Sequence, residues 1–275
     1  MAVVAISREI GTAGNQVGLA VARALGCAFV DREIIVEAAR RYEVAAERLA
    51  DVDERAPSFW QRFDRERRRL LVFIRAALLD RLADGACVVT GRLAPMLLRD
   101  VPPVLLVRVT APLDVRVRRV MAEARLDEPA ARAQIAAYER ELAAQAQSLF
   151  DLEDWRDPVH YDVVVNTARL AVEECAALVV RAAEAEAHRP SPAVLARLRD
   201  HALAAAVHAA LGRERTLGAL AIEVASEGGR VTLGGAVIGP AHAARARAIA
   251  AAVPGVREIL CRSAEPVPIP PVERV

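Results

Sequence analysis

The sequence predicts a two-part α/β protein, in which a parallel sheet flanked by helices is followed by a small α+β unit of αββαβ order. Residues 1 to about 187 alternate between continuous apolar runs and helical stretches. Uninterrupted apolar strands separated by helices are typical of parallel sheets that are buried on both faces. Beyond residue 195 the apolar residues instead alternate on either side of a Gly-Gly turn, which indicates a hairpin.

Five apolar runs are predicted to be the buried strands of the first part. They are residues 2–7, 27–30, 87–90, 104–109 and 161–165. A long helical and charged region is expected over about residues 32–84. In open parallel sheets, ligands bind at the carboxyl ends of the strands, so the residues that follow each run are the first candidates for a site.

The second part is predicted to contain two helices and three strands. The helices cover about residues 193–211 and 240–252, and the last strand covers 256–260. We expect a domain at 1–187, a linker at 188–194, a second domain at 195–264 and a proline-rich, extended tail at 265–275.

The composition indicates a soluble, cytoplasmic protein. The 275 residues are 54% apolar with a formal charge of +1, which gives no general case for nucleic-acid binding. The four cysteines form no CxxC pair, so a disulfide framework or zinc site is not expected. We expect neither a signal peptide nor a transmembrane segment. All 37 basic residues other than histidine are arginines, a bias that genome composition can explain.

The segment after the first strand has the layout of a phosphate-binding loop, in which backbone N–H groups and a helix N-terminus receive the anion. The usual GxxxxGK[ST] loop ends in a lysine and a hydroxyl. Here Asn15 and Gln16 stand in those places, and Glu9 replaces the first glycine. The alternative is a plain strand-to-helix turn. The phosphate-binding candidates are Ser7, Gly11, Thr12, Ala13, Gly14, Asn15 and Gln16.

Arginines must supply any cation that meets phosphate in a chain without lysine. Arg8 lies at the mouth of the loop, and a guanidinium can bind phosphate oxygens bidentately. The alternative is a surface arginine, or one that pairs with Glu9. Arg116 and Arg119 lie on one helix face, which is either solvated or directed at phosphates. We take these three arginines as the catalytic candidates.

The second and third strands end in further candidates. Asp31 and Arg32 could bind the hydroxyl or amine groups and the phosphate of a second ligand. Equally, Asp31 could cap a helix and Arg32 could be solvated. Gly91 and Arg92 repeat the same arrangement. The basic cluster at 62–69 is interleaved with carboxylates, which favours a solvated helix face with internal ion pairs over a nucleic-acid patch.

At these residues the chain resembles the cytidylate kinase-like family of P-loop nucleoside monophosphate kinases. The matching elements are Ile6–Gly11 with Gly14-Asn15, Asp31–Ile35, Gly91-Arg92, Ala111–Leu113, Asp154-Trp155, Asp157-Pro158, Tyr161-Asp162 and Asn166-Thr167. The resemblance implies an ATP phosphate site at the loop, with Mg²⁺, and a monophosphate site near Asp31, Arg32 and Arg92. CMP is the favoured acceptor.

The sequence departs from the family pattern at an Asp-x-x-Arg element, where Glu139 and Leu142 align and Arg140 is displaced. Lid arginines stabilise charge on the transferred phosphoryl group in these kinases. This departure keeps open a second function, a catalytically weak or inactive nucleotide-binding regulator.

Residues 195–263 resemble a BON domain through Gly229–Val237 and Val253–Val256. The resemblance implies a small module that binds a protein or a phospholipid-type ligand. Regulation of the first domain by this module is a separate hypothesis. A scaffold function for this module alone is the third alternative. The sequence indicates neither an oligomeric state nor residues that would hold a metal.

Overall fold

The computed structural model describes residues 2–31, 33–44, 64–84, 87–189, 191–235 and 240–262. The first part is a five-stranded sheet with parallel strand pairs in the order β2-β3-β1-β4-β5. The predicted parallel sheet is therefore confirmed, with strand ends close to those expected. The strands are β1 (Val3–Arg8), β2 (Ala28–Val30), β3 (Cys87–Thr90), β4 (Val104–Thr110) and β5 (Val163–Asn166).

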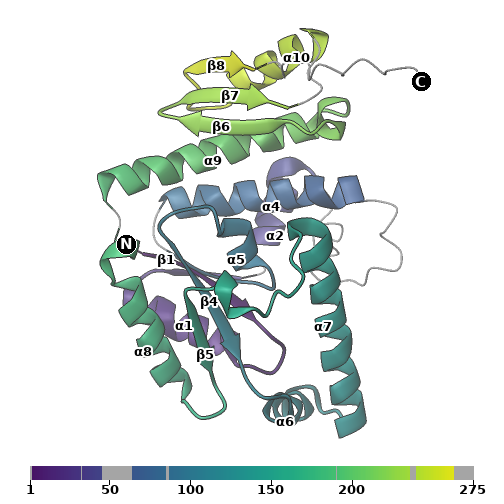
Figure 1. Cartoon of the computed structure of the whole chain (residues 1–275), viewed down its shortest axis with the longest axis vertical. Coiled ribbons are helices and arrows are strands. Elements are labelled where there is room, and N and C mark those ends of the chain that lie inside the picture. The colour runs from purple at the N-terminus through teal and green to yellow at the C-terminus, as the bar shows by residue number, and fades with distance from the viewer. Residues whose placement is uncertain are drawn as a thin grey trace, which may run out of the picture.

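Helices cover both faces of this sheet (Figure 1). Side chains alternate between the faces along a strand, so Val3 and Ala5 of β1 pack on one side and Val4 and Ile6 on the other. The first side is covered by α2 (Glu33–Tyr42), α4 (Asp64–Asp84) and α5 (Ala94–Leu98). The second side is covered by α1 (Gly14–Leu25) and α8 (Val172–Ala183). Burial on both sides explains why β1 is apolar throughout.

Two further helices follow β4 and lead to the candidate site. They are α6 (Leu113–Ala124) and α7 (Glu128–Phe150). Asp127 caps α7 by accepting a hydrogen bond from the Ala130 N–H at 2.9 Å. The inner face of α7 packs on Trp155 and Tyr161, which lie on either side of a short 3₁₀ turn (Pro158–His160).

The second part confirms the predicted αββαβ order. Strand β6 pairs antiparallel with β7, and β7 pairs parallel with β8. Gly228 and Gly229 join β6 to β7 with φ of 57° and 86°, the positive values that a tight two-residue hairpin needs. The elements are α9 (Pro192–Arg213), a 3₁₀ turn (Leu217–Ala219), β6 (Glu223–Glu227), β7 (Arg230–Gly234), α10 (Pro240–Ala251) and β8 (Glu258–Cys261).

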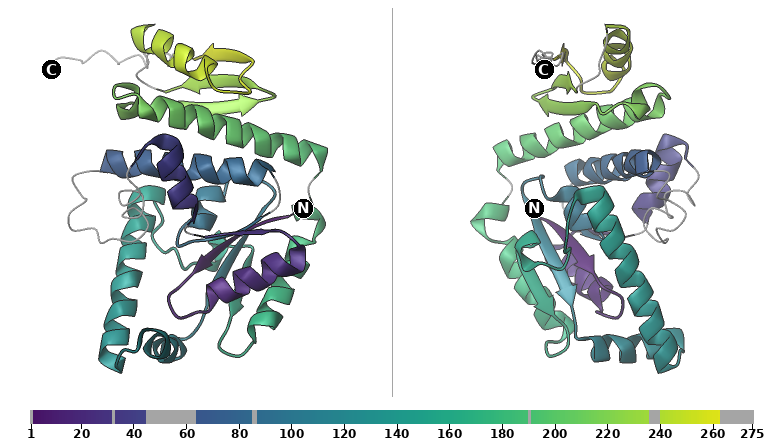
Figure 2. Two further views of the ribbon diagram at one scale, coloured as in Figure 1. Left: turned by 180° about the vertical axis from the view of Figure 1, so that it is seen from behind. Right: turned by 45° about the vertical axis from the view of Figure 1, so that its right-hand side comes forward.

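Helix α9 connects the two parts and lies beside α4 (Figures 1 and 2). It begins where Ser191 accepts a hydrogen bond from the Val194 N–H at 3.2 Å and Pro192 occupies the first helical position. Leu198 and Ala209 on one side of α9 belong to the core that contains α4. Val207 and Leu211 on another side belong to the core of the small sheet. The helix is therefore apolar on two faces.

Several sequence expectations fall outside the described residues. They concern Arg32, Arg62 and the other side chains of the basic cluster up to Arg68, and the tail at 265–275. The domain limits stay a proposal. Helix α9 begins inside the expected linker at 188–194.

Candidate active site

The β1–α1 loop (Glu9–Ala13) forms a tight turn that leads into α1. Gly11 and Ala13 adopt positive φ of 76° and 59°. The Thr12 side chain is buried and donates a 2.7 Å hydrogen bond to the Glu9 carbonyl, which closes the turn. Ala13 caps α1 without a side-chain hydrogen bond. Because the first-turn N–H groups of a helix have no intrahelical acceptor, this end of α1 can donate to an anion.

The loop glycines allow close packing of the backbone. A Cβ atom on Gly14 would lie 2.5 Å from the Arg8 Cβ, and one on Gly11 would lie 2.7 Å from the Arg116 carbonyl oxygen. Real Cβ atoms do not tolerate such distances. The two glycines therefore hold the loop against β1 and α6, a role that the sequence motif alone did not specify.

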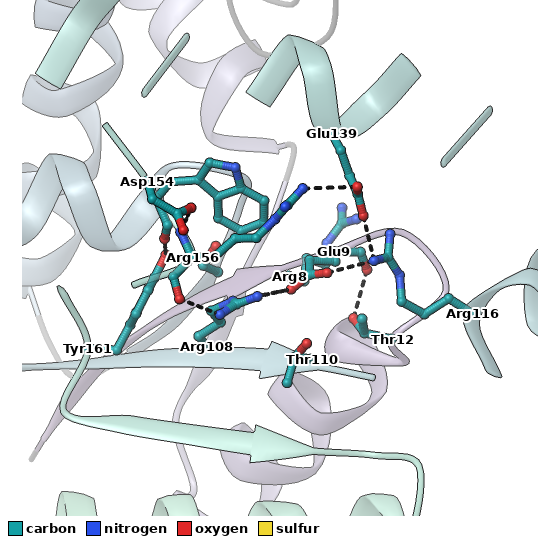
Figure 3. Close-up of polar contacts among 12 residues, drawn as sticks. Arg8, Glu9, Thr12, Arg108, Thr110, Arg116, Glu139, Asp154, Arg156 and Tyr161 are labelled. Atoms are coloured by element: carbon teal, nitrogen blue, oxygen red, sulfur yellow. Dashed lines mark hydrogen bonds and ion pairs between the residues drawn. The ribbon is translucent and has the colours of Figure 1, made fainter. Parts of the chain in front are cut away.

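Glu9 occupies the first position of the loop, and its carboxylate is buried between two arginines (Figure 3). Arg108 of β4 donates from Nη2 and Nε to Oε1 at 2.6 and 3.2 Å. Arg116 of α6 donates from Nη1 to Oε2 at 2.7 Å. The side chains of Glu9 and Arg116 are only 3% and 4% exposed, so water screens this pair little.

The interactions continue into a closed ring that we call the ion-pair ring. Arg116 also donates to Glu139 of α7 at 2.6 Å, and Arg156 donates to the other oxygen of Glu139 at 2.9 Å. Arg108 closes the ring with a 2.6 Å hydrogen bond to the Arg156 carbonyl. The ring therefore links the loop, β4, α6, α7 and the segment before β5. Its members are Glu9, Arg108, Arg116, Glu139 and Arg156 (Figure 3).

Trp155 and Tyr161 support the ring from the segment that precedes β5. The guanidinium carbons of Arg108 and Arg156 lie 5.2 and 5.3 Å from the Trp155 ring centroid, within the range of cation–π attraction. The Tyr161 hydroxyl donates to the Trp155 carbonyl at 2.8 Å. Burial raises the pKa of Tyr161 to about 12, so this hydroxyl keeps its proton at neutral pH.

Arg116 and Arg119, the predicted catalytic pair on α6, both contact the loop backbone. Arg116 donates from Nε to the Ile10 carbonyl at 2.9 Å. Arg119 donates to the Gly11 carbonyl at 3.2 Å and to the carbonyl and hydroxyl of Thr167 at 2.7 and 2.9 Å. Thr167 in turn donates to the Thr12 carbonyl at 2.8 Å. These contacts fix the shape of the loop.

Arg8, Asn15 and Asp31 come together at the ends of β1 and β2. Asn15 Nδ2 donates to Asp31 at 3.0 Å, and the nearest guanidinium nitrogen of Arg8 lies 3.7 Å from the same carboxylate. The side chain in the usual lysine position is therefore hydrogen-bonded to Asp31. Gln16 follows it on the first turn of α1, with its side chain exposed.

Arg92 lies after β3 and faces α7. Its guanidinium stacks 4.2 Å from the Tyr138 ring centroid and is 3.5 Å from Glu141. The Ser7 hydroxyl donates to the Arg92 carbonyl at 3.1 Å, and the Gly91 N–H donates to the Ile6 carbonyl at 3.1 Å. The structure thus places Ser7 of β1 close to Gly91 and Arg92, which follow β3, at the edge of the sheet where the loop lies.

Two buried guanidinium nitrogens beside the loop have no hydrogen-bond acceptor among the described residues. They are Nε of Arg8 and Nη2 of Arg116. Buried donors are nearly always satisfied in folded proteins, so these two call for an acceptor from a ligand or from water.

The structure shows where α7 places Glu139, Arg140 and Leu142, the residues at which the sequence departs from the family pattern. Leu142 is fully buried against Trp155, and the Arg140 side chain is exposed. Glu139 takes the place beside Arg116. Sequence reasoning missed Glu9, Arg108, Glu139 and Arg156 as members of one network. One signal was available, since Arg108 is a charged residue inside an otherwise apolar strand.

A comparison with known proteins shows the family of this chain. The model of the cytidylate kinase-like family matches residues 3–169. The chain belongs to this family. Its first part thus has the P-loop kinase-like fold, and the described β1–α1 loop, α6 and α7 all fall within the matched residues. The BON domain matches residues 199–261, which contain most of α9 and the small sheet.

A solved structure with this fold is that of an uncharacterized protein from Eubacterium ventriosum. It superposes with a TM-score of 0.51 at 18% identity and covers 68% of this chain and all of that one. A shikimate kinase from Bacteroides thetaiotaomicron gives a TM-score of 0.41 at 15% identity, over 67% of this chain and 99% of that chain.

A uronate isomerase from Corynebacterium glutamicum is 37% identical over 103 residues, which make up 38% of this chain. The chain spans about a fifth of the length of that relative, as the match covers 20% of it. In the described part of the chain, no group of three metal-ligating side chains occurs, and no helix is long and apolar enough to cross a membrane.

Proposed function

We propose that this protein binds ATP at the β1–α1 loop and transfers a phosphoryl group to a nucleoside monophosphate, with CMP the favoured acceptor. The observation that carries the proposal is the pair of unsatisfied buried donors, Arg8 Nε and Arg116 Nη2, beside the free N–H groups at the start of α1. A phosphate chain would provide acceptors for both arginines.

The loop residues fit a triphosphate better than they fit a metal ion on its own. Ser7 and Thr12 use their hydroxyls in hydrogen bonds to carbonyls, and Asp31 is a carboxylate beside the loop that lies outside the ion-pair ring. Mg²⁺ keeps several waters and is usually held by one or two carboxylates and the substrate phosphates. We therefore expect Mg²⁺ to arrive with ATP, where it neutralises phosphate charge.

The protein would contribute position and charge. Arg8, which precedes the loop, would take over the role of the usual lysine, whose position Asn15 occupies, and would bind the phosphates as a planar fork. Arg116 and Arg119 would hold the loop in its binding shape, and Arg116 would also present its free Nη2 to the phosphates. Arg92 and Asp31 would orient the acceptor, with Arg32 a further candidate. Such positioning can account for much of the rate of a phosphoryl transfer.

A second function, a nucleotide-binding regulator with weak or no turnover, is favoured by one observation. Arg116 is already paired with both Glu9 and Glu139, and α7 presents Leu142 to the core where the family pattern has an arginine. Charge on a transferred phosphoryl group would then be poorly stabilised. In this case the BON domain, which would bind a protein or a phospholipid-type ligand, would receive the signal.

The experiment separates binding from turnover. ATP binding to the full chain is measured by calorimetry, and ADP formation is measured with Mg²⁺ and each nucleoside monophosphate. Turnover with a monophosphate supports the kinase, while tight binding without turnover supports the regulator. Absence of ATP binding would exclude both functions.

Variants locate the site. Arg8→Gln should weaken ATP binding about tenfold or more, since a charge-assisted hydrogen bond contributes about 1.5–3 kcal/mol. Arg8→Lys tests whether a point charge is sufficient. Arg118→Gln is the matched control, because Arg118 is exposed on α6 and pairs only with Asp114 among the described residues. Equal effects of Arg8→Gln and Arg118→Gln would place ATP elsewhere.

A further inference from the structure

A cavity of about 850 Å³ lies between the kinase-like part and the BON domain, and none of the β1–α1 loop residues lines it. Its walls come from α4 and from the ends of α5 and α7 on one side, and from α9, β6 and β7 on the other. Figure 1 shows α4 and α9 side by side, with the small sheet next to α9. This volume falls in the range of pockets that hold small organic ligands.

One side of the cavity is apolar. Leu71 and Val72 of α4, Leu97 of α5, and Leu149 and Phe150 at the end of α7 line it. All five side chains remain partly exposed to solvent. A hydrocarbon chain or ring placed against them would remove this apolar surface from water, which favours binding.

Two of the acidic groups in the lining, Asp100 and Asp200, are already engaged. Arg75 of α4 donates from Nη2 to both carboxylate oxygens of Asp100 at 2.8 and 2.7 Å. Asp200 of α9 accepts a 3.1 Å hydrogen bond from the Ser226 hydroxyl. These carboxylates therefore have less capacity to attract a cationic ligand.

The basic groups in the lining, in contrast, have hydrogen-bond donors without acceptors among the described residues. Nε of Arg75 is buried without an acceptor among the described residues. Arg197 and Arg262 line the cavity and form no ion pair within the described residues. His201 and His208, two turns apart on α9, add imidazoles near Arg75, and burial lowers the pKa of both. Glu227 is an acidic residue in the lining that likewise forms no described ion pair.

We propose that this cavity binds a small amphipathic organic anion, either a carboxylate or a phosphate monoester, whose apolar body lies on the α4–α7 side and whose anionic group meets Arg75, Arg197 and Arg262. Because the walls belong to both parts of the chain, the bound anion contacts both the BON domain and the kinase-like part. This site is independent of the nucleotide site proposed above.

The test uses four eight-carbon probes on the full chain, with calorimetry as the readout. Octanoate and octyl phosphate should both bind, and their relative affinity decides between a carboxylate and a phosphate ligand. Octan-1-ol carries the same chain without charge and should bind about tenfold more weakly or worse, the effect of losing one charge-assisted hydrogen bond. Octylammonium should not bind. Equal affinity for octanoate and octan-1-ol would overturn the proposal.

Variants on α9 and at the residue that follows β8 provide the matched comparison. Arg197→Gln and Arg262→Gln should each weaken octanoate binding severalfold to about tenfold. Both side chains are exposed, so the fold should be retained. Arg199→Gln is the control, because Arg199 is exposed on the same helix but does not line the cavity. A loss of affinity in Arg199→Gln equal to that in Arg197→Gln would contradict a defined site.

Histidine NMR gives a second, local readout. Bound octanoate should move the imidazole signals of His201 and His208 and raise their pKa values, because a nearby anion stabilises the charged imidazole. His160 and His242 do not line the cavity and serve as internal controls. Movement of the control signals in place of His201 and His208 would place the anion at another surface and overturn the proposal.

Discussion

At the scale of single residues, Glu9 determines how the arginines around the loop are used. Its carboxylate receives hydrogen bonds from both Arg108 and Arg116, which lie on different elements. Without it, two largely buried guanidinium groups would face each other. The acidic residue at the start of the loop thus permits arginines, bulkier than lysine, to pack directly beside the β1–α1 turn.

We predict that Glu9→Gln lowers the free energy of unfolding by about 3–5 kcal/mol, because loss of one partner leaves buried charge uncompensated. Urea denaturation followed by Trp fluorescence would measure it. Asp114→Asn removes an exposed partner of Arg118 and should cost no more than about 1 kcal/mol. If both substitutions lowered the free energy of unfolding by the same amount, the ion-pair ring would not contribute to stability.

At the scale of elements, the loop depends on close contact with α6. Gly11 and Gly26 both have positive φ, 76° and 62°, yet only Gly11 has a neighbour, the Arg116 carbonyl, where a Cβ would be placed. The comparison of these two glycines separates backbone strain from steric contact.

Gly11→Ala should therefore be the more harmful substitution. Gly26→Ala carries only the left-handed strain of about 1–2 kcal/mol, whereas Gly11→Ala must also displace α6 from the loop. We expect a lower thermal midpoint for Gly11→Ala than for Gly26→Ala, together with weaker ATP binding. Equal midpoints and equal ATP affinity would show that the loop does not need its contact with α6.

The sequence predicts these elements well and their mutual contacts poorly. Continuous apolar runs identified the five parallel strands, because burial on both faces leaves a clear pattern. The Gly228-Gly229 turn identified the hairpin, because only residues with little steric restriction adopt positive φ at both positions. The ion-pair ring joins Glu9 to residues about a hundred positions away, and no local pattern encodes such a partner. The cavity between α4 and α9 was likewise not predictable, since it arises from packing.

At the scale of the whole molecule, the two parts meet across a contact that contains ionisable groups. His208 of α9 faces α4, and burial together with Arg75 lowers its pKa. The pKa of His201 is lowered as well, again mainly through burial. The folded state therefore disfavours protonation at this contact.

Stability should accordingly fall as the pH falls. Below about pH 6.5 these histidines bind protons in the unfolded chain, whereas in the folded chain they do so only at a lower pH. Their contribution to the free energy of unfolding is therefore fully present above about pH 6.5 and is lost as the pH falls below it. We expect His208→Gln to flatten the dependence of the thermal midpoint between about pH 8 and about pH 5.5. His242→Gln on α10 is the control. An unchanged slope in His208→Gln would contradict the prediction.

The continuity of α9 has a consequence for how the chain can be divided. Leu198 and Ala209 complete the core around Phe73, while Val207 and Leu211 complete the core of the small sheet. A protease cut between residues 188 and 194 would break the chain, but the two fragments should stay associated. Separation would expose to water the apolar surfaces of α4 and α9 that now cover each other. The kinase-like part and the BON domain thus share α9, and the apolar core of each part includes side chains from this helix.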